Sequence, residues 1–173
     1  YYLKNLYPNK KFFLYDQYIV NDKLSYADFK DNEIIILPPE VKLDEQIKFD
    51  LIVSARSFME MKSKYIDNYF KFIHNRINEK GLFLNINRYQ KNTSGENIKF
   101  DEYPYAKKTW DVVLSETSFN QKLIHFLLTR KKASDSLDIE LVKIRNKRLS
   151  LSEIKPLKIK FNILNKIKIL VRK

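Results

Sequence analysis

The sequence lacks cysteine altogether and has only two glycines in 173 residues. Without cysteine the chain forms no disulfide bond and no thiolate metal site, and a reducing compartment is permitted. Glycine occurs only at Gly81 and Gly95, so there is no Walker loop, nucleophile elbow or glycine-rich turn after a strand. No apolar run is long enough to cross a membrane as a helix. These absences exclude several common kinds of enzyme site.

The composition that remains is typical of one globular domain. Apolar residues make up 44% of the chain and aromatic residues 14%, unlike the composition of disordered chains. The net charge of +12 is unevenly distributed. Residues 131–173 hold 13 basic and 4 acidic residues, which is +9, and the rest of the chain carries only +3. We therefore expect a nearly neutral body followed by a basic carboxyl-terminal segment.

Several apolar runs have the length and composition of strands. Continuous apolar runs, as opposed to alternating ones, favour a parallel sheet that is covered on both faces. Together with the helix described next, they predict an α/β fold with a mostly parallel, Rossmann-like sheet flanked by helices. The runs are KFFLYD (11–16), EIIILPP (33–39), FDLIVS (49–54), GLFLNIN (81–87) and the segments 110–114 and 122–131.

A helix is predicted between the third and fourth strands. Apolar residues recur at helical spacing from Tyr65 to Ile77. Ser63 is the expected amino-terminal cap, and Gly81 is the expected end. A shorter helix is expected to end before Pro8.

Polar side chains follow several of these strands. Ligands of open α/β sheets bind outside the carboxyl ends of the strands, which singles out Asp16, Leu37, Pro38, residues 54–60 and residues 85–89. Asp16 fits a carboxylate that accepts hydrogen bonds from ribose hydroxyls, or one that caps a turn. Glu60 fits either a site carboxylate or an acid at a helix start.

The stretch NINRYQK, residues 85–91, offers donors, acceptors and a ring for stacking. Asn85 and Asn87 share one face of the strand end, and Arg88 and Tyr89 follow. This set suits a polar sugar, and it equally suits a polar exit from a strand. His125 lies in an apolar run, where a hydrogen-bonded core histidine is more common than a catalytic one.

Three motifs are specific: SFMEM (57–61), GLFLNINRY (81–89), and EYPY (102–105) followed by WDVVLSE (110–116). Together they resemble the sugar O-methyltransferase family, a branch of the S-adenosylmethionine-dependent methyltransferases. The resemblance extends over roughly residues 1–130.

The resemblance implies a site and a cofactor. Asp16 would bind the ribose of S-adenosylmethionine, and Leu37 and Pro38 would lie beside its adenine. Ser54 and Ser57 would face the methionyl part, and Glu60 would be the base or orienting group for an acceptor hydroxyl. The residues implied for the acceptor sugar are Asn85, Asn87, Arg88, Tyr89, Tyr103 and Tyr105.

The sequence departs from the family in one respect. Methyltransferases of this kind place an acid and a glycine-rich turn after the first strand, and neither glycine here follows a candidate first strand. The chain therefore corresponds to a domain that lacks the first strand and this turn. We divide it into a partial methyltransferase-like domain, residues 1–132, and a basic extension, residues 133–173.

The end of the extension has two compatible patterns. Leu157 to Ile163 alternate apolar with polar residues like a strand, and residues 163–171 also fit one helical face. A basic amphipathic helix would suit an anionic membrane surface. We expect a cytoplasmic protein that can contact the inner membrane surface through residues 151–173, and no nucleic-acid partner.

The leading functional hypothesis is O-methylation of a sugar or surface-glycan precursor. The alternative is a non-catalytic, methyltransferase-like remnant that binds a protein partner, a glycan intermediate or an anionic membrane surface. No metal site is expected.

Overall fold

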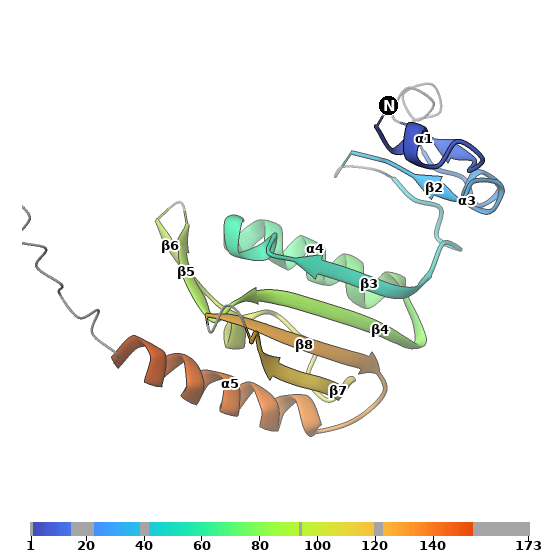
Figure 1. Cartoon of the computed structure of the whole chain (residues 1–173). Helices are drawn as coiled ribbons and strands as arrows, with labels where there is room; N and C mark the ends of the chain where they lie inside the picture. Colours follow the sequence, from blue (N-terminus) through green and yellow to red (C-terminus); the bar gives the residue numbers. More distant parts are fainter. Residues whose placement is uncertain (1, 15–22, 39–41, 94, 120–122, 154–173) are drawn as a thin grey trace, which may run out of the picture.

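The computed structural model describes residues 2–14, 23–38, 42–93, 95–119 and 123–153. It is a mixed α/β structure around a four-stranded sheet with the order β3-β4-β8-β7 (Figure 1). The strands are β3 (Phe49–Ala55), β4 (Ile77–Arg88), β7 (Trp110–Thr117) and β8 (Ile124–Lys131), and the long helices are α4 (Ser63–Arg76) and α5 (Ser136–Glu153).

The central sheet is mixed, which corrects the prediction of a mostly parallel one. β3 and β4 are parallel, whereas β8 is antiparallel to both β4 and β7. β7 and β8 are joined by a short connection, and a short connection allows only antiparallel neighbours. A parallel β3–β4 pair needs a crossover, and α4 provides it. The apolar runs thus located the strands without giving their directions.

A smaller unit precedes β3. It contains α1 (Tyr2–Leu6), β1 (Phe12–Phe13), α3 (Tyr26–Asp31) and β2 (Ile34–Ile35), with β1 and β2 parallel. Its own small core is formed by Phe13, Leu24 and Ile47. Phe29 meets Phe49 at the start of β3 edge-to-face, with ring centroids 5.9 Å apart. This contact links the small unit to the central sheet.

Helix α4 forms where the helical spacing predicts it, but both of its ends differ from the prediction. The cap is Lys62, and Ser63 is the first helical residue, whose N–H and hydroxyl donate to Glu96 on β6. The helix ends at Arg76, and β4 begins at once and runs through Gly81. Gly81 marks close packing instead of a helix end, because a Cβ there would lie 2.8 Å from Ile77 Cγ1.

A hairpin extends beyond the end of β4. It consists of β5 (Gln90–Thr93) and β6 (Glu96–Lys99), and the short helix η2 (Phe100–Glu102) follows it. A second short helix, η1 (Phe58–Glu60), follows β3 and contacts β5. The hairpin therefore lies against the segment that connects β3 to α4.

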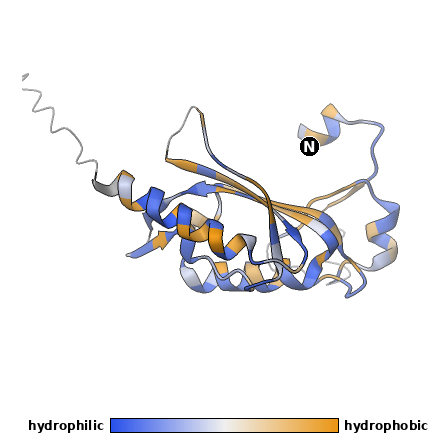
Figure 2. Ribbon diagram, turned by 90° about the horizontal axis from the view of Figure 1, so that it is seen from below, coloured by the Kyte–Doolittle hydropathy of each residue, from blue (hydrophilic) through white to orange (hydrophobic). Residues whose placement is uncertain are grey.

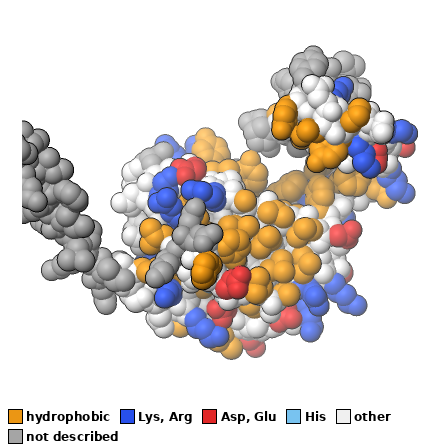
Figure 3. Space-filling view, in the orientation of Figure 1, with side chains coloured by type: hydrophobic (Ala, Val, Ile, Leu, Met, Phe, Trp, Pro, Cys, Tyr) orange, Lys and Arg blue, Asp and Glu red, His pale blue; other side chains and the backbone are white. Residues whose placement is uncertain are grey.

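Both long helices lie on the same face of the sheet (Figure 2). Phe70 and Ile73 of α4 and Leu137 and Ile144 of α5 join one core cluster with Phe83 of β4. On the opposite face, hydrophobic side chains of the sheet gather at the surface (Figure 3). Leu51 and Val53 of β3 are about half exposed there, at 53% and 51%. Among the described residues, the core is thus concentrated on one side of the sheet.

Helix α5 comprises residues 136–153 of the predicted basic extension. Besides its apolar contacts, it is held by Arg148, whose guanidinium binds the buried carboxylate of Asp101 on η2. No helix in the described ranges is long and apolar enough to cross a membrane. The predicted surface-binding segment lies outside the described residues from 154 onwards, so its strand and helix alternatives both stay predictions.

Candidate functional site

The carboxyl end of β3 leads into a strained bend. Arg56 has a φ of 58°, in the left-handed region that non-glycine residues rarely adopt. Its N–H donates to Ile86 O at 2.7 Å, and the hydroxyls of Ser54 and Ser57 lie 2.8 Å apart across the bend. Strain of this kind persists only where the surrounding structure holds it, and it concentrates at functional sites. The stretch SARS thus forms a fixed rim at the sheet edge.

Glu60 lies at the end of this rim and is paired with Lys91. The ion pair joins η1 to β5, and the Glu60 side chain is 53% exposed. Beside it, Thr93 Oγ1 donates to Met59 O at 2.6 Å, so a second contact fixes η1 against the hairpin. A carboxylate held by a lysine in this way is oriented and remains open to solvent.

A pocket of about 250 Å³ lies between the end of β3 and α4. Ser54 and Ser57 supply its polar groups, and its walls are otherwise apolar. The family resemblance implies that both serines face the cofactor, and the structure brings them together. The apolar lining residues are Ile52, Val53, Phe58, Met61, Tyr69, Phe72 and Ile73.

Asn85 and Asn87 are fully buried beneath the rim. Asn87 Nδ2 donates to Asn85 Oδ1 at 2.6 Å, and Asn85 Nδ2 donates to Tyr105 OH at 2.9 Å. Asn87 Oδ1 accepts the backbone N–H of Met59 in η1 at 3.3 Å. The three side chains therefore support the rim from within the core, and their direct contact with a substrate stays a prediction.

Tyr89 belongs to a second buried network, together with His125. Its hydroxyl lies 2.6 Å from Thr117 Oγ1 and 3.0 Å from His125 Nδ1, and Ser115 Oγ lies 2.9 Å from His125 Nε2. Ser115 in turn donates to Glu140 of α5 at 2.7 Å. His125 is therefore a hydrogen-bonded core histidine, as predicted. Burial lowers its pKa to about 4.

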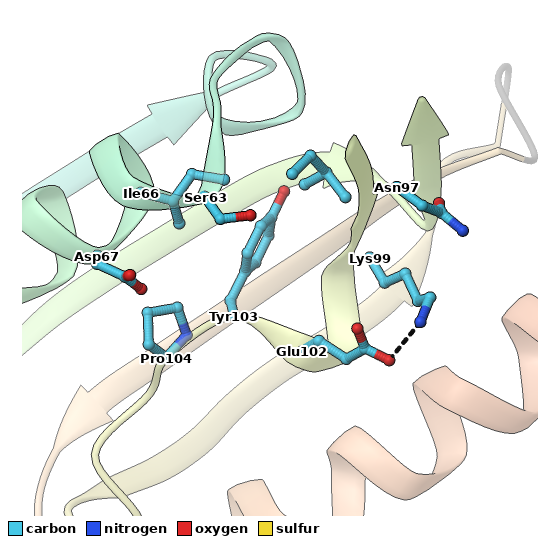
Figure 4. A pocket seen from close by; sticks show the side chains of 9 residues that line it. Ser63, Ile66, Asp67, Asn97, Lys99, Glu102, Tyr103 and Pro104 are labelled. Atoms are coloured by element: carbon cyan, nitrogen blue, oxygen red, sulfur yellow. Dashed lines mark hydrogen bonds and ion pairs between the residues drawn. The ribbon is translucent and has the colours of Figure 1, made fainter. Parts of the chain in front are cut away.

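Tyr103 is in a different situation from Tyr105, although both are buried. It lines a second pocket of about 110 Å³ between the start of α4 and β6 (Figure 4). Its hydroxyl has no hydrogen-bond partner among the described residues. Burial raises the pKa of Tyr103 far above its ordinary value, so the phenol stays neutral.

The other predicted site residues are spread over the chain. Asp16 lies outside the described residues. Leu37 packs against the small core of the amino-terminal unit, and neither it nor Pro38 lines the pocket beside Ser54. Arg88 is half-buried at the end of β4, on the face of the sheet opposite Asn87.

Three further side chains contribute to this site. They lie in residues 54–60 and 85–91, which the sequence singles out, but the sequence assigns no individual role to any of them. Lys91 pairs with Glu60, Phe58 separates the two pockets by packing edge-on against Tyr103, and Arg56 carries the strained backbone. Nothing in their local sequence marks these roles, because each depends on a partner or a backbone angle fixed by the fold. No group of three acidic, histidine or cysteine side chains suited to a metal occurs in the described part of the chain.

Comparison with known proteins leaves the family open. No family model and no curated protein matches the sequence. Among solved structures, the chain is similar to the crystal structure of TehB from Haemophilus influenzae, with a TM-score of 0.39 and 18% sequence identity over 61% of this chain. The chain spans 44% of the length of that TehB chain. A similarity of this size assigns no function.

Proposed function

We propose that this chain carries the acceptor-side half of an S-adenosylmethionine-dependent O-methyltransferase whose acceptor is a sugar hydroxyl. Two independent lines support the proposal. One is the resemblance of residues 57–61, 81–89 and 102–116 to sugar O-methyltransferases. The other is the geometry at the carboxyl ends of β3 and β4.

The observation that carries the proposal is the rim formed by Ser54 to Glu60. It follows directly from β3, the strand parallel to β4, and so occupies the edge where open α/β sheets bind their ligands. The rim combines two serine hydroxyls, a strained backbone at Arg56 and a carboxylate oriented by Lys91. This is a binding edge with one candidate proton acceptor.

The residues present fit the cofactor's sulfonium end. The pocket beside Ser54 and Ser57 has apolar walls, which include Phe58 and Met61, and these suit a methyl group and the carbon chain beside it. The bound cofactor supplies a methyl carbon attached to a positively charged sulfur. Holding the acceptor oxygen in line with that carbon supplies much of the rate.

Glu60 is the proposed proton acceptor. A bound S-adenosylmethionine would supply the methyl group, and the Glu60 carboxylate would take the proton from the acceptor hydroxyl. Lys91 holds the Glu60 carboxylate in an ion pair.

The test uses the protein that contains this chain, with radiolabelled S-adenosylmethionine and a panel of sugar acceptors. Glu60→Gln should lower turnover by about 10²- to 10⁴-fold while cofactor affinity is retained. The matched control is Glu45→Gln, which changes an exposed glutamate outside the rim. If the unsubstituted protein does not bind the cofactor in calorimetry, the proposal is wrong. If Glu60→Gln turns over normally, Glu60 is not the base.

A further inference from the structure

The face of the central sheet opposite α4 and α5, here called the outward face, is apolar across all four strands. Residues that pair across neighbouring strands have their side chains on the same face, so the register shows which side chains lie together. One apolar row crosses the whole sheet, and an apolar pair lies two residues further along β4. The row is Val53, Leu84, Leu128 and Leu114, and the pair is Ile86 and Phe126.

This outward face is open to solvent over the part of the chain that the structure describes. Val53 and Leu114, at the two edges of the row, are 51% and 42% exposed. The four side chains on β4 and β8 are only partly buried and belong to neither core cluster of described residues. Hydrophobic side chains accordingly gather at this surface of the sheet (Figure 3). A continuous apolar patch of this kind is an interaction site in most soluble proteins.

Helix α5 ends beside one end of the outward face. Leu151, in its last turn, lines a pocket together with Tyr89, Gln90 and Leu123. These three residues lie where β4 ends and β8 begins, and Leu123 is 54% exposed. The 20 residues 154–173 follow α5 in the sequence. This segment therefore starts at the end of the sheet, close to the last apolar pair of the outward face.

The sequence of the segment suits an apolar sheet surface. Ten of the residues 154–173 are apolar, seven are basic and none is acidic. In the strand pattern and in the helical pattern alike, most of the apolar residues share one side and most of the basic residues lie on the other. Residues 157–173 would span about 25 Å as a helix and more as a strand. The outer strands of a four-stranded sheet are only about 14 Å apart, so either form is long enough to cross the face.

The position of the segment favours it over a separate partner. A segment that is covalently attached beside a surface meets that surface intramolecularly, at an effective concentration in the millimolar range. A second copy of the chain, or a membrane, has to be bound from solution. The apolar residues of the segment therefore have their nearest apolar surface within the same chain.

We propose that residues 154–173 pack through their apolar side against the outward face of the sheet and close the second side of the core. The basic residues then point to solvent. The inference is independent of the proposed function, because it involves neither the cofactor nor the acceptor. It makes the segment a structural part of the domain instead of a membrane anchor.

Because the chain has no cysteine, introduced cysteines give a direct test. Ile167→Cys is combined in turn with Val53→Cys, Leu84→Cys and Leu114→Cys in the full chain, and each variant is oxidised. A disulfide requires Cα atoms about 4.4–6.8 Å apart, so at least one pair should close within a single chain. The matched control is Tyr65→Cys on α4, whose side chain is 50% exposed, like that of Val53 at 51%. The best pair on the outward face should close at least about tenfold faster than this control.

Thermal unfolding gives a second measurement, with two substitutions that leave the charge unchanged. Ile167 lies on the apolar side in both patterns, and Asn162 lies on the polar side in both. Ile167→Ser should lower the melting temperature by about 3–8 °C, because a buried apolar side chain is removed. Asn162→Ser should leave the melting temperature unchanged.

Four results would overturn the inference. One is a rate of disulfide formation on the outward face no greater than that of the Tyr65 control, and another is an equal melting temperature for Ile167→Ser and Asn162→Ser. A disulfide that joins two chains, seen as a doubled mass without reductant, would assign the face to a second copy. Sedimentation with phosphatidylglycerol vesicles, in the absence of any disulfide within one chain, would assign the segment to a membrane.

Discussion

Asp101 offers the most direct test of how α5 is held to the sheet. Its side chain is 0% exposed, and its carboxylate accepts from Arg148 Nε at 2.7 Å and Nη2 at 3.2 Å and from Arg145 Nε at 3.1 Å. Asp101→Asn keeps the shape but removes the charge, so the Arg148 guanidinium is left buried without its counter-charge. Breaking a buried pair from one side costs about 3–5 kcal/mol.

Asparagine retains one acceptor oxygen, so we expect a loss of about 2–4 kcal/mol in the free energy of unfolding at pH 7. The matched control is Asp135→Asn, which weakens an exposed pair with Lys108 at 3.7 Å. Exposed pairs contribute about 0–1 kcal/mol, and asparagine is also accepted at the start of a helix. The free energies of unfolding of the two variants in urea should therefore differ by about 1–4 kcal/mol.

The same variant also tests how the free energy of unfolding depends on pH. Burial alone would raise the pKa of Asp101, but the hydrogen bonds and charges of Arg148 and Arg145 outweigh it and hold the pKa below its ordinary value. The stabilisation is then present above about pH 4, the range of an unfolded aspartate, and is lost as the pH falls through the folded pKa. The difference in free energy of unfolding between the unsubstituted protein and Asp101→Asn should therefore become smaller below pH 4. A difference in free energy of unfolding under 1 kcal/mol at pH 7 would refute the stabilising role of the Asp101–Arg148 pair. So would a difference that stays constant in acid.

Three further predictions concern residues of the core. Gly81→Ala should cost about 1–3 kcal/mol in urea unfolding, because its Cβ would lie 2.8 Å from Ile77 Cγ1 and 2.9 Å from Asn78 O, and an unchanged midpoint would show that this part of β4 relaxes freely. His125 has a pKa of about 4 when folded and about 6.5 when unfolded, so the free energy of unfolding should fall by about 3 kcal/mol from pH 6.5 to pH 4. His125→Gln should remove that fall, and its persistence would assign it to other groups. Tyr105→Phe should cost about 1–3 kcal/mol by leaving Asn85 Nδ2 without its partner, and a stable variant would contradict the network.

Local pattern was enough to locate most of the elements. The helical spacing of residues 65–77 predicted α4, and the apolar run of residues 49–54 predicted β3. In each case a local pattern of apolar and polar residues, set by one neighbouring surface, was enough to locate the element. The direction of β8 was not predictable in this way. It depends on the length of its connection to β7, and an apolar run carries no information about direction.

Helix α5 lies within the basic segment, and one of its faces packs in the core. This face packs through apolar residues at helical spacing, which are Leu137, Leu141 and Ile144. Arg148 lies on the same face and interrupts the apolar pattern. Its charge is tolerated because Asp101, 47 residues earlier, provides a buried carboxylate. No local pattern reveals such a partner, and a count of charges does not distinguish a core helix from a solvated one.

The candidate site was only partly predictable for a related reason. Ser54, Ser57 and Glu60 follow a strand directly, so the rule for strand ends located them. Lys91 comes from a hairpin whose position depends on the whole connection after β4, and its contact with Glu60 is set by tertiary structure.

The buried polar groups beneath the rim explain how a strained bend can persist at a sheet edge. Arg56 keeps its left-handed backbone while Met59, three residues on, donates its N–H to Asn87. Asn87 donates to Asn85 on the same strand, and Asn85 donates to the hydroxyl of Tyr105, so the amides form one chain of hydrogen bonds. A satisfied buried network is rigid, because any displacement leaves a polar group unpaired. Tyr103 lies next to this network without joining it, because its hydroxyl has no hydrogen-bond partner among the described residues, whereas that of Tyr105 accepts from Asn85.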